Sequence, residues 1–297
     1  MPQPTEPASQ LAASSLPGSL AVAIGGLARA RAVARAAAGL EPRPLVASLS
    51  GLPGAGKSTL SAALARLLED TEGLTVAGFS LDDLYKSRAE REALAQSVHP
   101  LFAQRGVPGT HDVERGLELV QRLSAAAPGD VTRLPRFDKL ADALLPEAAW
   151  PTFAGRPDVL VCDGWFWGAR PGDPAALESP LNAREAADDA DGTFRRAVQS
   201  ALAVGFPELF ACSDFHVHLL VPSYERSVEW RVLQERSERR ARGLDPDDVD
   251  PVRIEWFLQL FERVGRLPVQ FSRGAIVRLG DGHQVQAFEL VPASERA

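Results

Sequence analysis

The chain has 297 residues, 45% of them hydrophobic, which is enough for one large α/β domain with additions or for two small domains. Its formal net charge is −7 and it has no dense basic block, which argues against a nucleic-acid-binding protein. Two cysteines cannot form a disulfide framework or a zinc site by themselves, so we expect a reducing, cytoplasmic compartment. No apolar run is long enough for a membrane-spanning helix, so no membrane association is expected.

The N-terminal residues are predicted to lie outside the main domain. Residues 1–17 are rich in Pro, Ser, Ala and Gln without periodicity and indicate a disordered tail. Residues 18–44 are expected to form a helical extension, with an alanine- and arginine-rich helix between Ser19 and Leu40. Residues 45–297 are expected to form the main domain.

A phosphate-binding loop is the clearest motif of the chain. An apolar run, Leu45 to Leu49, predicts a buried strand before it, and apolar residues at helical spacing follow it. Its glycines let main-chain N–H groups turn toward a phosphate, and the start of the helix adds partial positive charge. We expect Lys57 to reach the β- and γ-phosphates of a nucleotide and the Ser58 hydroxyl to bind Mg²⁺. The loop consists of Gly51, Leu52, Pro53, Gly54, Ala55, Gly56, Lys57, Ser58 and Thr59.

Lysine is rare in this chain. Only Lys57, Lys86 and Lys139 are present, whereas arginine accounts for the other 29 of the 32 Lys and Arg residues. The compact ammonium of Lys57 suits a phosphate loop better than a planar guanidinium does. We expect Lys139 to have a functional role as well.

Two further apolar runs end in aspartate. Residues 74–80 predict a buried strand that leads into Asp82 and Asp83. Carboxylates at the carboxyl end of a strand point into the crevice where α/β proteins bind ligands, whereas an aspartate there can also cap a helix. Both roles can be filled, one by each aspartate, and we expect Asp82 to be the functional one. A third strand ends in Asp163, a Walker B arrangement in which the carboxylate meets Mg²⁺ or its water shell.

Two loops carry side chains suited to a small anion. Residues 105–112 surround a Gly-x-Pro-Gly turn that precedes a helix expected from 113 to about 126. Residues 134–139 place Arg, Asp and Lys within a few positions. Taken alone, each loop is equally consistent with an ordinary solvated turn. The candidate groups are Arg105, Thr110, His111, Arg136 and Lys139.

The C-terminal third contains an arginine-rich helix, predicted for residues 224–242. Its arginines are partly balanced by glutamates, so a solvated, salt-bridged face is one interpretation. The other is a lid, at about residues 224–250, that lays arginines over a transferring phosphate. Before it, His216 and His218 alternate onto one face of a strand, but a metal pair is disfavoured because no third ligand is evident.

Together, the stretches GLPGAGKST, SLDDLY, HPL, RGVPGTHD, LPRFDK and CDGW resemble the P-loop D-glycerate 3-kinases, which belong with the uridine kinase, phosphoribulokinase and pantothenate kinase group. The resemblance covers about residues 45–280, and the RGVPGTHD and LPRFDK stretches are its most specific part. It implies a three-layer α/β sandwich with a central parallel sheet of about five strands, the phosphate-loop strand in its middle, and an arginine-bearing helical lid.

The resemblance also implies an activity: transfer of the ATP γ-phosphoryl group, with Mg²⁺, to a hydroxyl of a small hydroxy acid, most directly D-glycerate. Lys57 and the loop amides would hold the triphosphate, and Ser58 and Asp163 would place Mg²⁺. Asp82 would orient and deprotonate the acceptor, and lid arginines would neutralise charge. The substrate site would comprise Asp82, Tyr85, Arg105, Thr110, His111, Arg136 and Lys139.

Two alternatives stay open at this point. One is a kinase for another metabolite, such as pantothenate, a nucleoside or a sugar phosphate. The other is a nucleotide-dependent switch ATPase, although the Asn-Lys-x-Asp run typical of guanine recognition does not occur. The expected partner is a small-molecule substrate and not a nucleic acid, and the sequence does not predict the oligomeric state.

Overall fold

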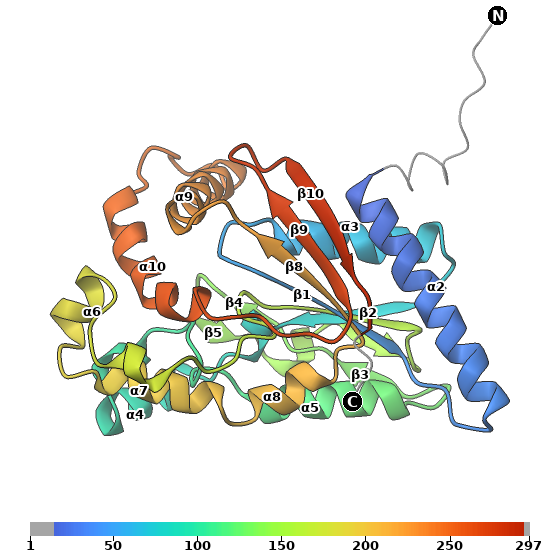
Figure 1. Cartoon of the computed structure of the whole chain (residues 1–297). Coiled ribbons are helices and arrows are strands. Elements are labelled where there is room, and N and C mark those ends of the chain that lie inside the picture. The colour runs from blue at the N-terminus through green and yellow to red at the C-terminus, as the bar shows by residue number, and fades with distance from the viewer. Residues whose placement is uncertain (1–14, 294–297) are drawn as a thin grey trace, which may run out of the picture.

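The computed structural model describes residues 15–293, so most of the tail predicted for residues 1–17 lies outside the described residues. Figure 1 shows the arrangement of the elements. The helices are α2 (Leu16–Ala37), α3 (Lys57–Asp70), α4 (Arg88–Ser97), α5 (Val113–Ala125), α6 (Ala183–Asp188), α7 (Thr193–Leu202), α8 (Phe206–Ala211), α9 (Tyr224–Ala241) and α10 (Pro251–Gly265). The strands are β1 (Leu45–Gly51), β2 (Val76–Ser80), β3 (Val131–Arg133), β4 (Phe137–Asp138), β5 (Ala143–Leu144), β6 (Thr152–Ala154), β7 (Val159–Asp163), β8 (Phe215–Leu220), β9 (Gly274–Leu279) and β10 (Val285–Val291). Short 3₁₀ helices are η1 (Leu81–Leu84), η2 (Pro100–Ala103), η3 (Glu147–Ala149) and η4 (Pro174–Leu177).

The central sheet has six strands in the order β10-β9-β8-β1-β7-β2. The five strands from β9 to β2 are parallel, and β1, which leads into the phosphate loop, is the middle one. This confirms the predicted α/β class and the predicted parallel sheet. The register places Asp163 of β7 between Leu49 of β1 and Ser80 of β2. The ends of three neighbouring strands therefore meet at the edge where such sheets bind ligands.

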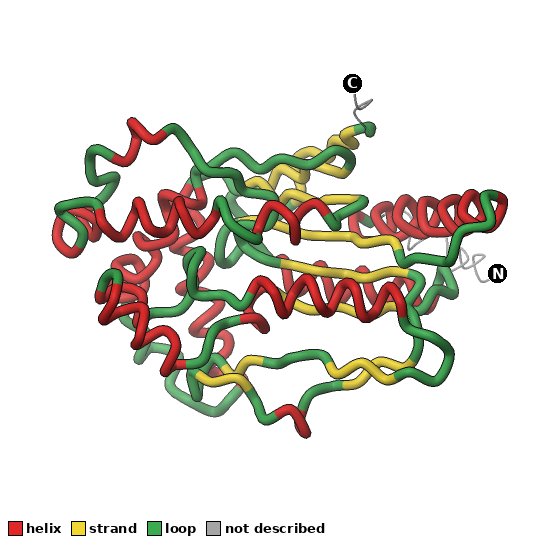
Figure 2. Tube along the Cα trace, turned by 90° about the horizontal axis from the view of Figure 1, so that it is seen from below, coloured by secondary structure: helices red, strands yellow, loops and turns green. Residues whose placement is uncertain are grey.

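The sequence does not predict the sixth strand, β10. It pairs antiparallel with β9 at the edge of the sheet. Its side chains are largely exposed, including Phe288 and Leu290, so the alternating burial pattern that reveals a strand is absent. The short β3–β6 and β4–β5 ladders are also unforeseen, and Figure 2 shows them lying apart from the central sheet.

Helices cover both faces of the central sheet (Figures 1 and 2). On one face, Leu20 and Ile24 of α2 and Leu64 of α3 are fully buried against apolar side chains of β1 and β8. On the other face, α5, α7, α8 and α10 contribute to a second apolar cluster that includes Val46 and Leu160 of the sheet. The parallel strands are therefore buried on both sides, as a three-layer arrangement requires.

Helix α2 starts and ends a few residues before the predicted bounds. The Ser15 side chain caps it by accepting a hydrogen bond from the Gly18 N–H. An ion pair between Arg31 and Asp214 joins this helix to the sheet, because Asp214 also accepts a hydrogen bond from the N–H of Val46 in β1. Between residues 15 and 293, neither α2 nor another helix has the length and apolar character needed to cross a membrane.

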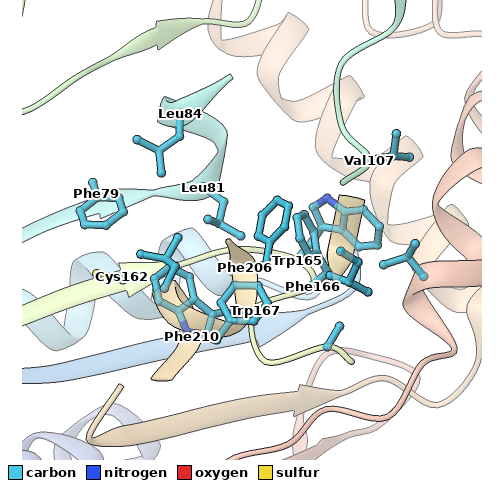
Figure 3. Close-up of a cluster of buried hydrophobic side chains, with 14 of the residues drawn as sticks. Phe79, Leu81, Leu84, Val107, Cys162, Trp165, Phe166, Trp167, Phe206 and Phe210 are labelled. Carbon is cyan, nitrogen blue, oxygen red and sulfur yellow. The ribbon is translucent and has the colours of Figure 1, made fainter. Parts of the chain in front are cut away.

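An apolar cluster supports the carboxyl edge of the sheet (Figure 3). Leu81 and Leu84 of η1 are fully buried in it, which fixes the short helix and leaves the two aspartates between them on the side away from the core. A Cβ on Gly164 would lie 2.3 Å from Leu81 Cδ1, so the turn after β7 can approach η1 this closely only with a glycine there.

Candidate active site

A cavity of about 730 Å³ opens at the carboxyl edge of the parallel strands. The phosphate loop and the first turn of α3 line its middle, and α9 and α10 line it from the opposite side. Because β2 and β9 lie on opposite sides of β1, η1 and the β4–β5 hairpin line one end, and β9, β10 and the start of α2 line the other. A cavity of this size can hold two small ligands side by side.

The phosphate loop adopts the geometry that its glycines permit. Gly54 and Gly56 have φ angles of 82° and 87°, which side chains with a Cβ rarely adopt, and the space beside Gly56 is open. The Lys57 Nζ donates hydrogen bonds to the carbonyls of Gly51 (2.7 Å) and Leu52 (3.2 Å). Burial lowers the pKa of Lys57 to about 8. Helix α3 begins at this lysine, so its free N–H groups and the ammonium face the same place.

Asp163 and Ser58 form a group of oxygen ligands suited to Mg²⁺. The Asp163 carboxylate accepts hydrogen bonds from Ser80 Oγ (2.6 Å) and Ser61 Oγ (3.1 Å), which fix its orientation at the cavity. Ser58 lines the same cavity from the first turn of α3. The described residues contain no cluster of three or more His, Cys, Asp or Glu side chains that could hold a metal by itself. One carboxylate and one hydroxyl fit Mg²⁺, which takes its remaining ligands from phosphates and water.

Asp82 lies at the wall of the cavity and has two partners. Its Oδ2 contacts the Lys139 Nζ at 2.6 Å, and its Oδ1 accepts a hydrogen bond from the Tyr85 hydroxyl at 2.6 Å. Burial alone would raise the pKa of Asp82, but the Lys139 ammonium and the Tyr85 hydroxyl outweigh it and hold the pKa at about 2. Burial raises the pKa of Tyr85 well above its ordinary value, so this hydroxyl keeps its proton.

Asp83, unlike Asp82, caps the short helix η1. It closes a capping box with Ser80 at the start of η1. Its carboxylate also pairs with the Arg136 guanidinium at 3.0 Å and accepts a hydrogen bond from the Phe137 N–H at 3.3 Å. These contacts attach the β4–β5 hairpin to η1. Arg136 therefore lies behind the cavity wall and does not line the cavity, whereas Lys139 of the same hairpin does.

Comparisons with known proteins identify the family of the chain and its fold. No protein-family model matches the chain. The chain is 30% identical over 223 residues to an uncharacterized kinase, mug58, of Schizosaccharomyces pombe, an alignment that covers 70% of this chain and 77% of the relative.

The chain therefore belongs to the same family of P-loop kinases. As a member of this family it is a phosphotransferase.

Solved structures show the same fold. A D-glycerate 3-kinase from Cryptococcus neoformans aligns over 92% of this kinase and 99% of its own chain, with a TM-score of 0.72 and 20% identity. A putative fructose transport system kinase from Silicibacter aligns over 83% of this kinase and 96% of its own chain, with a TM-score of 0.51 and 21% identity. At these identities the agreement concerns the fold.

Thr110 and His111, two of the predicted substrate residues, lie behind Tyr85 and do not line the cavity of the kinase. Thr110 is fully buried, and its hydroxyl accepts from the Gly106 N–H and donates to the Val107 carbonyl, which closes its own loop. The His111 ring packs at a tilt against the Tyr85 ring with centroids 4.6 Å apart, and burial lowers the pKa of His111 to about 4. His111 therefore supports the Tyr85 wall and Thr110 supports its own loop, and direct contact with a substrate stays a prediction for both.

Arg105 lines the cavity beside Lys139 and has a fixed position. Its guanidinium contacts Asp142 Oδ1 at 2.5 Å and donates to the Lys139 carbonyl at 2.9 Å. Asp142 in turn contacts Arg91, a side chain only 1% exposed, at 2.7 Å. The two arginines outweigh burial and lower the pKa of Asp142. The sequence gives no sign of Asp142, because its partners are far away in the chain and its φ of 51° is known only from the fold.

Among the arginines of α9, Arg231 lines the cavity of the kinase. It pairs with Glu235 at 2.8 Å on the next turn of the helix. A Cβ on Gly54 would lie 2.9 Å from the Arg231 main-chain nitrogen, so the phosphate loop and α9 are in close contact. Ser227 reinforces this contact by donating a hydrogen bond to the Pro53 carbonyl at 2.6 Å. The sequence predicts an arginine-bearing helix here but not which arginine lines the cavity.

The hairpin between β9 and β10 contacts both α9 and the phosphate loop. The His283 ring stacks on Trp230 of α9 with centroids 3.6 Å apart, and its Nε2 lies 2.9 Å from the Gly54 carbonyl oxygen. The Trp230 indole N–H donates to the Asp281 carbonyl at 3.2 Å. None of these contacts is evident from the sequence, since β10 itself is not predicted.

The two histidines of β8 belong to a buried hydrogen-bond chain. His216 lies between the hydroxyls of Ser48 and Ser50, both at 2.7 Å, and His218 contacts Ser50 at 2.8 Å. Burial lowers the pKa of His216 to about 3 and that of His218 to about 4, so both rings are neutral near pH 7. The chain links β8 to β1 within the sheet.

Proposed function

We propose that this kinase transfers the γ-phosphoryl group of ATP to a hydroxyl of a small hydroxy acid, with D-glycerate as the first candidate. The observation that carries the proposal is one cavity lined by a phosphate loop with Lys57, by a carboxylate, Asp82, and by two cations, Arg105 and Lys139. A carboxylate beside two cations suits an acceptor that carries both a hydroxyl and an acid group. The name of the fold neighbour from Cryptococcus neoformans supports D-glycerate among such acids.

In this proposal the nucleotide occupies the middle of the cavity and the end farther from Asp82. The loop amides and Lys57 bind the triphosphate, and Arg231 neutralises charge from the opposite side. Ser58 and Asp163 would hold Mg²⁺, which would compensate negative charge on the triphosphate. The far end is lined mainly by apolar side chains and suits the nucleobase, and its members are Leu16, Pro17, Leu60, Ala63, Leu279 and Val285.

The acceptor would occupy the end formed by η1 and the β4–β5 hairpin. Its hydroxyl oxygen forms a bond to the γ-phosphorus while the bond to the β–γ bridging oxygen breaks, and that electron pair leaves with ADP. The hydroxyl proton passes to Asp82, whose position is fixed by Tyr85. Arg105 and Lys139 bind the acid group, which places the hydroxyl in line for transfer.

The test is a direct assay of purified protein with ATP, Mg²⁺ and single acceptors: D-glycerate, L-glycerate, pantothenate, uridine and a sugar phosphate. We expect ADP formation coupled to a phosphorylated glycerate that mass spectrometry identifies, and loss of both in Asp82→Asn. Strong turnover of pantothenate or uridine without turnover of glycerate would replace the substrate assignment. ADP release with no phosphorylated acceptor would instead indicate an ATPase.

A further inference from the structure

The charged side chains at the acceptor end of the cavity are already paired with one another. Lys139 contacts Asp82 at 2.6 Å, and Arg105 contacts Asp142 at 2.5 Å. Both oxygens of the Asp82 carboxylate are in use, because Oδ2 contacts the ammonium of Lys139 and Oδ1 accepts the Tyr85 hydroxyl. The residue proposed as the general base is therefore neutralised by the residue proposed to bind the acid.

This pairing makes Asp82 a poor base. A carboxylate with a pKa of about 2 has little tendency to take a proton from an alcohol, since general bases work best with a pKa closer to the working pH. The Lys139 ammonium supplies most of this lowering, and the Tyr85 hydroxyl supplies a smaller part. Removing the ammonium from Oδ2 would therefore raise the basicity of Asp82 and free the oxygen that the acceptor hydroxyl needs.

The Lys139 side chain is free to move while its main chain is held. The side chain is 59% exposed, and its stem carries several rotatable bonds. The Lys139 carbonyl, in contrast, accepts a hydrogen bond from Arg105, and Arg105 is fixed by Asp142. Asp142 is held in turn by the buried guanidinium of Arg91. Because its main chain is fixed and its side chain is flexible, the Lys139 ammonium can exchange one nearby anion for another.

We propose that Lys139 selects acidic acceptors by exchanging partners: it neutralises Asp82 in the empty site, and an acceptor that carries an anionic group draws the ammonium away. Asp82 Oδ2 then accepts the hydroxyl proton as the acceptor oxygen bonds to the γ-phosphorus and ADP leaves. The inference rests on the proposed function and extends it. The acid group of the substrate switches on the base in addition to anchoring the substrate.

The inference separates binding from turnover. A neutral alcohol with the same carbon skeleton, glycerol, offers nothing to Lys139, so a bound glycerol would face an Asp82 that is still neutralised. Discrimination between glycerate and glycerol should then appear in kcat as well as in KM. If Lys139 served only to bind the acid, its removal would weaken glycerate binding and leave glycerol turnover unchanged.

The first test compares glycerate and glycerol kinetics in the wild type and in Lys139→Met. We expect kcat/KM for D-glycerate to fall by about 100-fold, because a charged partner of the acid is lost, while kcat for glycerol rises by about tenfold. Lys86→Met is the matched control, since Lys86 does not line the cavity, and it should change neither value. Lys139→Arg should keep glycerol turnover as low as in the wild type. A glycerol kcat in Lys139→Met that is equal to or below the wild-type value overturns the inference.

The second test does not require turnover. With only three lysines in the chain, protein labelled with ¹⁵N-lysine gives few ammonium signals, and Lys139→Met assigns the one of interest. In the presence of a non-hydrolysable ATP analogue, D-glycerate should shift the Lys139 signal and glycerol should not. An unchanged Lys139 signal at saturating glycerate overturns the partner exchange.

The two tests also separate this inference from the function on which it rests. If the wild type phosphorylates D-glycerate but Lys139→Met does not raise kcat for glycerol, the partner exchange is refuted and the proposed function stands. If the wild type phosphorylates none of the hydroxy acids, both the proposed function and the inference are refuted.

Discussion

The two halves of the cavity are built in different ways. The phosphate half consists mainly of main-chain atoms from one nine-residue loop, and even Lys57 is held by the carbonyls of Gly51 and Leu52. The acceptor half consists of side-chain ion pairs between segments far apart in sequence, such as Asp82 with Lys139 and Arg105 with Asp142. In the proposed function the first half binds the triphosphate with little adjustment, whereas the second half must release the Lys139–Asp82 pair to admit an acidic acceptor. Specificity for the acceptor would then depend on this exchangeable pair.

The largest effect is expected in the phosphate half. Lys57→Met removes the one side-chain cation of the loop, so kcat/KM for ATP should fall on the order of 10³-fold. Thermal unfolding should change little, because a buried and desolvated ammonium contributes little to the fold. Steady-state kinetics and calorimetry measure both, with Arg66→Met, an exposed cation on the same helix, as the control. Near-normal activity in Lys57→Met would remove the loop from the mechanism.

The next effect concerns the base of the acceptor half. Asp82→Asn keeps the shape and the Tyr85 contact but cannot take a proton, so kcat should fall by roughly 10²- to 10⁴-fold. The affinity for ATP, measured by calorimetry, should stay within about twofold, since Asp82 lies outside the phosphate loop. A kcat close to that of the wild type would withdraw the proposed role of Asp82.

A smaller effect should follow from loosening the hairpin that carries Lys139. Asp142→Ala leaves the buried Arg91 without its carboxylate and places alanine at a φ of 51°, which together should reduce the free energy of unfolding by about 2 kcal/mol. We expect KM for the acceptor to rise by about tenfold while KM for ATP is unchanged. Asp142→Asn tolerates this backbone conformation and should lose less stability. Equal increases in both KM values would argue against a separate acceptor half.

The smallest effect is a pH dependence confined to the phosphate half. The pKa of Lys57 is lowered to about 8 in the empty site, so the ammonium loses its proton as the pH rises through that value. Binding a triphosphate must then restore the proton, and the Kd for an ATP analogue should rise by about fivefold between pH 8 and pH 9. Calorimetric titrations across this range provide the measurement. Lys57→Met should bind weakly but with a flat profile, and a flat profile in the wild type would contradict the assignment.

Sequence reasoning succeeds where function is encoded in consecutive residues. The phosphate loop, the parallel strands around it and helix α5 after the Gly-x-Pro-Gly turn are predicted because neighbouring residues determine each of them. It also favours Asp82 over Asp83, and in the structure Asp82, unlike Asp83, lines the cavity, because the buried leucines on either side of the pair fix η1. The same reasoning does not find β10, because an exposed edge strand lacks a buried pattern.

The acceptor half contains residues whose position relative to the cavity cannot be predicted from a single sequence. Thr110 and His111 share a motif with Arg105, but only the fold reveals that Tyr85 separates them from the cavity. The role of Asp142 can be recognised only in the fold, where its carboxylate pairs with both Arg91 and Arg105. A spacing pattern identifies the residues that gather near a site, whereas the packing between them decides which ones face the ligand.

The contact between the phosphate loop and α9 fixes one end of this helix. Gly54 lies against the main chain of Arg231, and Ser227 is bonded to Pro53, so the first two turns of the arginine-rich helix are attached to the loop. If α9 acts as the predicted lid, we expect its hinge beyond Arg231, in the second half of α9 or in the connection to α10. Such a hinge would admit and release the acceptor without disturbing the residues proposed to bind the triphosphate.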